Sequence, residues 1–152
     1  MTPVSNIYAR ISVLIEDSRY CKISDEEIEF IFEKYIETAI VLFKELNKKY
    51  KPRVVEDEFG EKFIKKTINS DDEDLDLDEE VILAHGMIIS WHNSVVLRDR
   101  FLKQNLNTSD FQQLSNATML ANNEVLHERI EKDFIKMRIR YRNRDWSGDG
   151  FE

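Results

Sequence analysis

One stretch of sequence decides the fold class of this chain: Val81-Ile82-Leu83-Ala84-His85-Gly86-Met87-Ile88-Ile89-Ser90-Trp91. Nearly every position is apolar, so a helix formed here has no polar face to turn toward water. Such a helix is surrounded on all sides, either by its own domain or by a neighbouring subunit. Gly86 interrupts the run at a cost of about 1 kcal/mol relative to alanine. We therefore expect Gly86 to permit a close contact between two helices.

Helical spacing of apolar residues extends the prediction to the rest of the chain. We expect four helices, over residues 6–17, 24–50, 78–104 and about 110–141. Only four glycines and two prolines occur among 152 residues, which favours long helices over many strands. The predicted fold class is therefore all-α, a small helical bundle of about four helices with an extended C-terminal arm.

Two of these helices begin at recognisable caps. Ser24-Asp25-Glu26-Glu27 is a capping box, in which the Ser24 hydroxyl accepts from the Glu27 amide and the Glu27 carboxylate reaches back. Asp76 or Asp78 can cap the third helix, with further acids in its first turn.

The predicted domain organisation is one helical domain over residues 1–143, followed by a C-terminal tail over 144–152. Residues 51–78 are interpreted as a charged loop insertion in that domain. Within them, Phe59 to Ile68 fits either a short strand pair or a loose helical turn. The acids from Asp71 to Glu80 repel one another, which favours a solvated loop.

The composition of the chain narrows the classes of function that it can have. The formal net charge of −8 disfavours general nucleic-acid binding. The single Cys21 cannot form an internal disulfide, which indicates a reducing compartment and a filler role for its side chain. No apolar run approaches the roughly 20 residues that span a bilayer. We expect a soluble protein with no membrane partner that is intracellular when made.

The charges are segregated along the chain. The acidic block is predicted to form an inter-subunit surface; the residues concerned are Asp71, Asp72, Glu73, Asp74 and Asp76. A calcium loop is disfavoured, because the block has no glycine at the position of the sharp turn. A solvated loop without a partner remains the alternative.

The basic end of the chain is the strongest candidate site. Its arginines alternate with aromatic and aliphatic residues, a composition typical of interface anchors. We predict that it docks to a partner through Arg138, Arg140, Tyr141, Arg142, Arg144, Trp146 and Phe151. The alternative is a charged last turn that stabilises the C-terminus of a helix.

No catalytic motif accompanies these features. His85 and His92 are seven residues apart, whereas zinc-binding pairs on a helix are usually four apart. We interpret both as polar core or interface residues and His127 as a surface residue. Neither a glycine-rich dinucleotide motif nor a P-loop occurs. The sequence therefore predicts no enzyme activity, no cofactor and no bound metal.

Five groups of segments follow one another over most of the chain. They are Ile7-Tyr8-Ala9-Arg10; Ile23-Ser24-Asp25-Glu26-Glu27-Ile28-Glu29; Tyr35-Ile36-Glu37-Thr38-Ala39-Ile40; Asp76-Leu77-Asp78-Glu79-Glu80-Val81-Ile82-Leu83-Ala84 with Met87 and Trp91; and Leu102-Lys103-Gln104 with Ser109-Asp110-Phe111 and Leu114-Ser115-Asn116-Ala117. In this order they resemble the head–tail connector, or neck, proteins of tailed phages of Gram-positive bacteria. The chain departs from that pattern in residues 51–75 and in the histidines of the third helix.

The resemblance implies a structural virion protein. Subunits of this kind form a ring beneath the portal that joins the DNA-filled capsid to the tail. The implied partners are the portal protein, neighbouring neck and tail proteins and further copies of the chain, while genomic DNA passes through the channel without sequence-specific binding. The alternative is a small helical regulator or antitoxin that binds DNA or a protein through its basic C-terminal end.

Overall fold

The computed structural model describes residues 1–12, 24–67, 73–105 and 110–144, and it describes their side chains except over 99–105 and 110–120. These residues form β1 (Thr2–Pro3), α1 (Val4–Ser12), α2 (Asp25–Leu42), α3 (Lys44–Tyr50), β2 (Arg53–Glu56), β3 (Lys62–Lys65), α4 (Leu77–Asn105) and α5 (Asp110–Arg144). The fold is therefore mostly helical. The all-α prediction with about four helices is corrected to five helices and a three-stranded sheet within the described residues.

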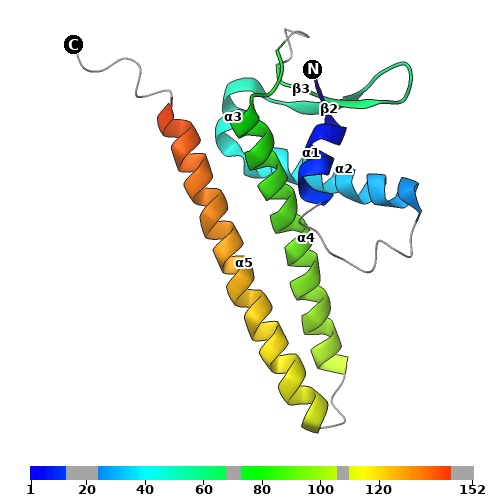
Figure 1. Cartoon of the computed structure of the whole chain (residues 1–152), viewed down its shortest axis with the longest axis vertical. Coiled ribbons are helices and arrows are strands. Elements are labelled where there is room, and N and C mark those ends of the chain that lie inside the picture. The colour runs from blue at the N-terminus through cyan, green and yellow to red at the C-terminus, as the bar shows by residue number, and fades with distance from the viewer. Residues whose placement is uncertain (13–23, 68–72, 106–109, 145–152) are drawn as a thin grey trace, which may run out of the picture.

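A long antiparallel pair, α4 and α5, forms the axis of the molecule (Figure 1). At 1.5 Å per residue these helices are about 43 and 52 Å long. The other elements gather around one end of the pair, beside the first half of α4 and the last half of α5 (Figure 1). No helix in the described residues has the length and apolar character needed to cross a membrane.

Reciprocal caps begin two of the helices. Ser24 Oγ accepts from the Glu27 amide at 3.3 Å, and Glu27 Oε2 accepts from the Ser24 amide at 3.0 Å, which confirms the predicted capping box. Asp76 and Glu79 repeat this arrangement at α4, with both amide-to-carboxylate distances at 2.9 Å. Asp76 rather than Asp78 is therefore the cap.

The helix predicted over residues 24–50 is broken at Phe43. The backbone there has φ −81° and ψ 71°, which separates α2 from α3. Phe43 is fully buried, and its ring meets that of Tyr141 edge-on at a centroid distance of 4.9 Å. Packing of this side chain between α2 and α5 thus outweighs the local helical preference.

Within residues 51–78, predicted as a charged loop, the described residues form a β-hairpin, while residues 68–72 lie outside the described part of the chain. β2 and β3 pair antiparallel, with Val54 opposite Ile64, and β1 pairs with the other edge of β3. Ile64 is fully buried. The turn reverses at Gly60, whose φ of +82° suits glycine. Residues 59–68 therefore contribute one strand rather than the predicted strand pair or helical turn, and the hairpin partner of that strand, β2, lies before this range.

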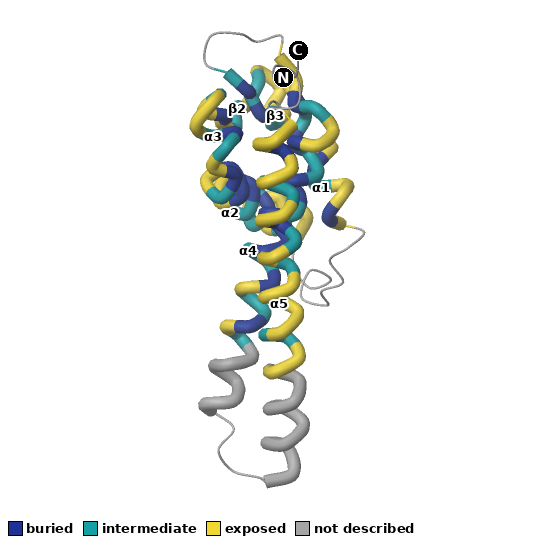
Figure 2. Tube along the Cα trace, turned by 90° about the vertical axis from the view of Figure 1, so that its left-hand side faces the viewer, coloured by how far each residue is buried: buried dark blue, intermediate teal, exposed yellow. Residues whose placement is uncertain are grey.

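The core confirms the interpretation of the apolar stretch. Every residue from 81 to 91 is buried or half-buried, because α1, α2 and α5 pack around this part of α4 (Figure 2). A Cβ atom on Gly86 would lie 2.8 Å from the Cβ and 3.1 Å from the Cα of Ala39 on α2. Gly86 therefore permits the close helix contact that its position in the sequence predicts.

The predicted helix at residues 6–17 begins earlier, at Val4, and its described part ends at Ser12. Its remaining residues and Cys21 lie in the segment 13–23, outside the described residues. Val4, Ile7 and Ile11 are buried against the core.

Candidate functional site

A buried carboxylate joins three parts of the fold near the start of α4. Glu79 is fully buried and accepts a hydrogen bond from Tyr141 Oη at 2.6 Å. Its second oxygen lies 2.9 Å from Lys66 Nζ and accepts from the Asp76 amide. The Lys66 ammonium is also buried and lies 4.5 Å from the ring centroid of Tyr50. Because both charges are buried and paired, removing either leaves the other without its partner.

The Tyr141 phenol is held in its protonated form at this site. Burial raises the pKa of Tyr141 above its usual value of 10, and the hydrogen bond to Glu79 raises it further. The phenol therefore remains a donor, and it ties the last turn of α5 to the first turn of α4.

Two arginines add further ties at the end of α5. Arg138 binds both carboxylate oxygens of Glu45 on α3, at 2.7 and 3.0 Å. Burial alone would raise the pKa of Glu45, but the Arg138 contact outweighs it and lowers that pKa. Arg144 binds Asp76 at 2.9 Å and Asp78 at 3.3 Å, and its guanidinium lies over the Tyr141 ring.

These contacts divide the predicted docking residues into three groups. Arg138, Tyr141 and Arg144 all bind other parts of the same chain. Arg140 and Arg142 are exposed on α5. Trp146 and Phe151 lie outside the described residues. Docking to a partner stays a prediction, and the structure assigns the first group an intramolecular role that the sequence did not indicate.

The predicted acidic surface is likewise divided. Asp71 and Asp72 lie outside the described residues, while Glu73 and Asp74 are exposed. Asp74 pairs with the amino terminus of Met1 at 2.8 Å. Asp76 caps α4 and binds Arg144. Part of the acidic block therefore stabilises this fold, and its role toward a neighbouring subunit remains a prediction.

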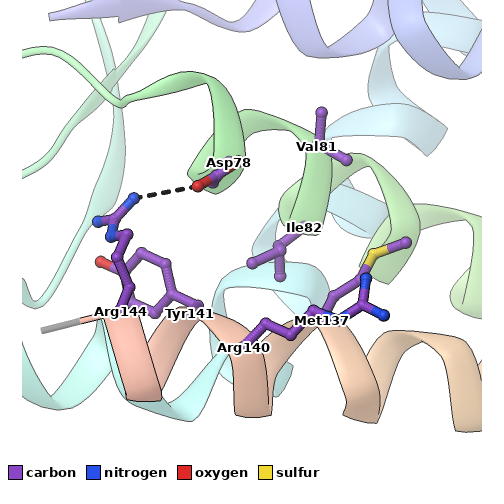
Figure 3. A pocket seen from close by; sticks show the side chains of 7 residues that line it. All are labelled: Asp78, Val81, Ile82, Met137, Arg140, Tyr141 and Arg144. Carbon is purple, nitrogen blue, oxygen red and sulfur yellow. Dashed lines mark hydrogen bonds and ion pairs between the residues drawn. The ribbon is translucent and has the colours of Figure 1, made fainter. Parts of the chain in front are cut away.

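A groove runs along the surface between α4 and α5, and we name it the α4–α5 groove. Its first hollow, of about 380 Å³, is lined by Asp78, Val81, Ile82, Met137, Arg140, Tyr141 and Arg144 (Figure 3). Its second hollow, of about 410 Å³, is lined by His85, Ile88, Ile130, Asp133, Lys136, Met137 and Arg140. The hollows share Met137 and Arg140, so they are adjacent parts of one groove.

The groove combines an apolar floor with a basic edge. Val81 and Ile82 approach from α4 and Met137 from α5, while Arg140 and Arg144 lie on the α5 side (Figure 3). Arg144 is paired with Asp78 across the first hollow. Arg140 makes no hydrogen bond or ion pair with any residue that the structure describes. Such a surface suits a segment that carries apolar side chains and carboxylates.

The histidines are placed by stacking and by helix contacts. The rings of His92 and His127 stack with 5.4 Å between centroids, and their Nδ1 atoms are 3.2 Å apart. The prediction of a polar core residue is confirmed for His92, which is buried, whereas the surface prediction is wrong for the half-buried His127. His85 Nδ1 contacts the Val81 carbonyl at 2.8 Å. Within the described parts of the chain, no three metal-ligating side chains converge on one point.

Comparison of the chain with protein-family profiles, with curated protein sequences and with solved structures gives no match. The resemblance to phage connector proteins therefore remains an expectation from the sequence.

Proposed function

We propose that this chain is a non-catalytic structural subunit: a head-to-tail connector of a phage that forms a ring beneath the portal and joins the DNA-filled capsid to the tail. The observation that carries the proposal is a second surface on α5, apart from the groove. Val125, Ile135 and Ile139 are 68%, 49% and 42% exposed, although all three are large and apolar.

These three residues lie on one face of α5. Val125 and Ile139 are fourteen residues apart, about four helical turns, with Lys132 midway between them, and Ile135 lies one turn before Ile139. Phe134, on the opposite face, is buried against the core. We name the exposed face, Val125, Ile135 and Ile139, the outer face of α5.

A ring of identical subunits needs two different surfaces on each copy, because each copy contacts one neighbour with one surface and the next neighbour with the other. The outer face of α5 and the α4–α5 groove are two separate surfaces, each able to contact a different neighbour. The net charge of −8 further supports a channel through which genomic DNA passes without sequence-specific binding. Location in the virion neck and contact with the portal belong to the same proposal.

Electron microscopy of particles that contain this protein tests the proposal. The expected result is a ring of this chain between head and tail. Particles carrying Ile135→Glu and Ile139→Glu are expected to lack joined tails, whereas Val41→Glu, at an exposed apolar residue of α2, leaves joining intact. Absence of the chain from virions would overturn the proposal.

The regulator alternative is less well supported by the geometry. It requires the basic C-terminal end to be available to DNA or a protein target. Two of its arginines, Arg138 and Arg144, are bound to Glu45 and to Asp76 with Asp78. Among the arginines at this end, only Arg140 and Arg142 are therefore exposed for such a target and outside these ion pairs. Salt-sensitive DNA binding by a chain that is absent from virions would favour the regulator over the connector.

A further inference from the structure

We propose that the α4–α5 groove is the acceptor for residues 145–152 of a second copy of this chain, so that copies join head to tail. The inference rests on the proposed function and deepens it, because it names the contact through which neighbouring subunits bind. It concerns a different surface from the outer face of α5.

Residues 145–152 and the groove have complementary chemistry. Residues 145–152 read Asp-Trp-Ser-Gly-Asp-Gly-Phe-Glu, with two aromatic and three acidic side chains and no basic one. The floor of the groove is apolar, and its charged lining is basic on balance: Asp133 is paired with Lys136 and Asp78 with Arg144, which leaves the charge of Arg140 in excess. Arg140 has no partner among the described residues, so an incoming carboxylate displaces no existing contact.

The spacing of the two hollows also fits this segment. The α5 residues that line the first hollow are centred near Tyr141 and those that line the second near Ile135, a separation of about 9 Å at 1.5 Å per residue. Trp146 and Phe151 are five positions apart, and a chain of that length spans at most about 17 Å. The two aromatic side chains can therefore occupy the two hollows in a single binding event.

The direction of α5 favours a segment from another copy. α5 passes the second hollow first, then the first hollow, and ends at Arg144. A chain that continues from Arg144 must reverse before it can reach the second hollow of its own copy. A segment from another copy can enter the groove without this reversal, which favours the second copy as occupant.

A contact of this kind is heterologous, because the donor segment and the acceptor groove are different surfaces of the chain. Repetition of a heterologous contact closes into a ring when the rotation between copies allows it. The self-association thus supplies the geometry that a ring subunit requires.

Full-length variants test the proposal by sedimentation and light scattering. The donor variant carries Trp146→Ala and Phe151→Ala, and the acceptor variant carries Lys136→Glu and Arg140→Glu. We expect the unaltered chain to self-associate with rising concentration and each variant to lose this association. Circular dichroism establishes that each variant is folded. The matched control, Lys44→Glu with Arg53→Glu, makes the same charge change at exposed sites on α3 and β2 and should associate normally.

Mixing the two variants identifies the occupant. The donor variant retains its groove and the acceptor variant retains its segment, so an equal mixture should form pairs that grow no further. A mixture that stays monomeric would overturn docking between copies. The same conclusion would follow if the unaltered chain is monomeric at every concentration, or if the donor and acceptor variants associate as strongly as the unaltered chain does.

The failure of this inference differs from the failure of the proposed function. A ring in virions whose grooves do not hold residues 145–152 would overturn the inference and leave the connector proposal standing. Self-association through the groove by a chain that is absent from virions would overturn the connector proposal and leave the inference about the groove standing.

Discussion

Helix α4 is held at two places by contacts of opposite kinds. Its first turn is tied through the buried carboxylate of Glu79, which binds Lys66 and Tyr141. Its middle is held by the approach of Gly86 to Ala39, where the backbones lie too close for a larger side chain. The first contact consists of an ion pair and hydrogen bonds between particular atoms, whereas the second sets the distance between two helices.

This difference sets how each contact fails. A buried ion pair fails when one partner is removed, because the remaining charge keeps its desolvation cost. A close apolar contact fails when atoms are added, because the interior is already packed densely. The expected effects of substitution at the two places therefore differ in size and in their dependence on pH.

The largest effect is expected at the charged contact. Glu79→Ala leaves the Lys66 ammonium buried without its partner, so the free energy of unfolding should fall by about 3–5 kcal/mol. Urea unfolding measures the change. Asp78→Ala serves as control, because Asp78 is exposed and its pair with Arg144 should contribute less than about 1 kcal/mol. Equal losses in the two variants would show that the buried network does not hold α4.

A smaller loss is expected at the close contact. Gly86→Ala places a methyl group 2.8 Å from Ala39 Cβ, and overpacking of this kind typically costs about 1–3 kcal/mol. The gain in helix propensity, about 1 kcal/mol, offsets part of that cost. Adding Ala39→Gly should restore part of the lost stability in urea unfolding. No recovery in the double variant would argue against the contact as the cause.

The third effect is a dependence on alkaline pH that belongs to the charged contact. The raised pKa of Tyr141 means that, above its ordinary value of 10, the phenol is ionised in the unfolded chain and still protonated in the folded one. Stability is therefore complete below pH 10 and decreases above it, by up to about 1.4 kcal/mol per pH unit for one such group.

Tyr141→Phe should reduce that slope in unfolding experiments between pH 9 and pH 11. Tyr8 contributes a slope of the same sign, because burial and then the charges of Glu33, Glu29 and Glu37 raise its pKa. The slope measured for Tyr8→Phe can therefore be compared with the slope measured for Tyr141→Phe. A slope unchanged in Tyr141→Phe would mean that the phenol is not held protonated by the fold.

The smallest effect is expected at the cap of α2, which resembles that of α4 in sequence but differs in surroundings. Ser24→Ala removes an exposed cap and should cost about 1 kcal/mol. Ser24→Gly should lower the free energy of unfolding by only a few tenths of a kcal/mol. Thermal unfolding of the three chains measures both differences, and the reverse order of stabilities would contradict a capping role.

Local signals in the sequence predict the parts of the fold that neighbouring residues control. The capping box at Ser24 and the role of Gly86 follow from spacing and composition, because each depends on a few positions along one helix. The break at Phe43 does not, because it depends on the ring of Tyr141, far away in the chain. The sequence leaves residues 59–68 open between a strand pair and a helical turn, because the strand at Lys62–Lys65 depends on pairing with β2 and β1.

The candidate site shows the same division. Its basic and aromatic composition is visible in the sequence, but the composition does not separate Arg138, bound to Glu45, from Arg140, which lies over the groove. These two side chains are two positions apart, a rotation of about 200° along the helix, so they lie on nearly opposite faces of α5. Their surroundings therefore depend on which face of α5 meets the core. Burial of Glu79 also left no local signal, since a first-turn acid is usually exposed.

The sequence by itself determined that this chain is mainly helical, where its buried central helix lies, how two helices begin, and that acidic and basic residues are concentrated in different segments. Only the tertiary structure decided which charges bind one another, that the sheet covers one end of the helix pair, and that Arg140, which has no partner among the described residues, lies on a groove between α4 and α5. The physical reason is range: caps and helical periodicity act within a few residues, whereas the environment of a charged side chain depends on residues that only folding brings near.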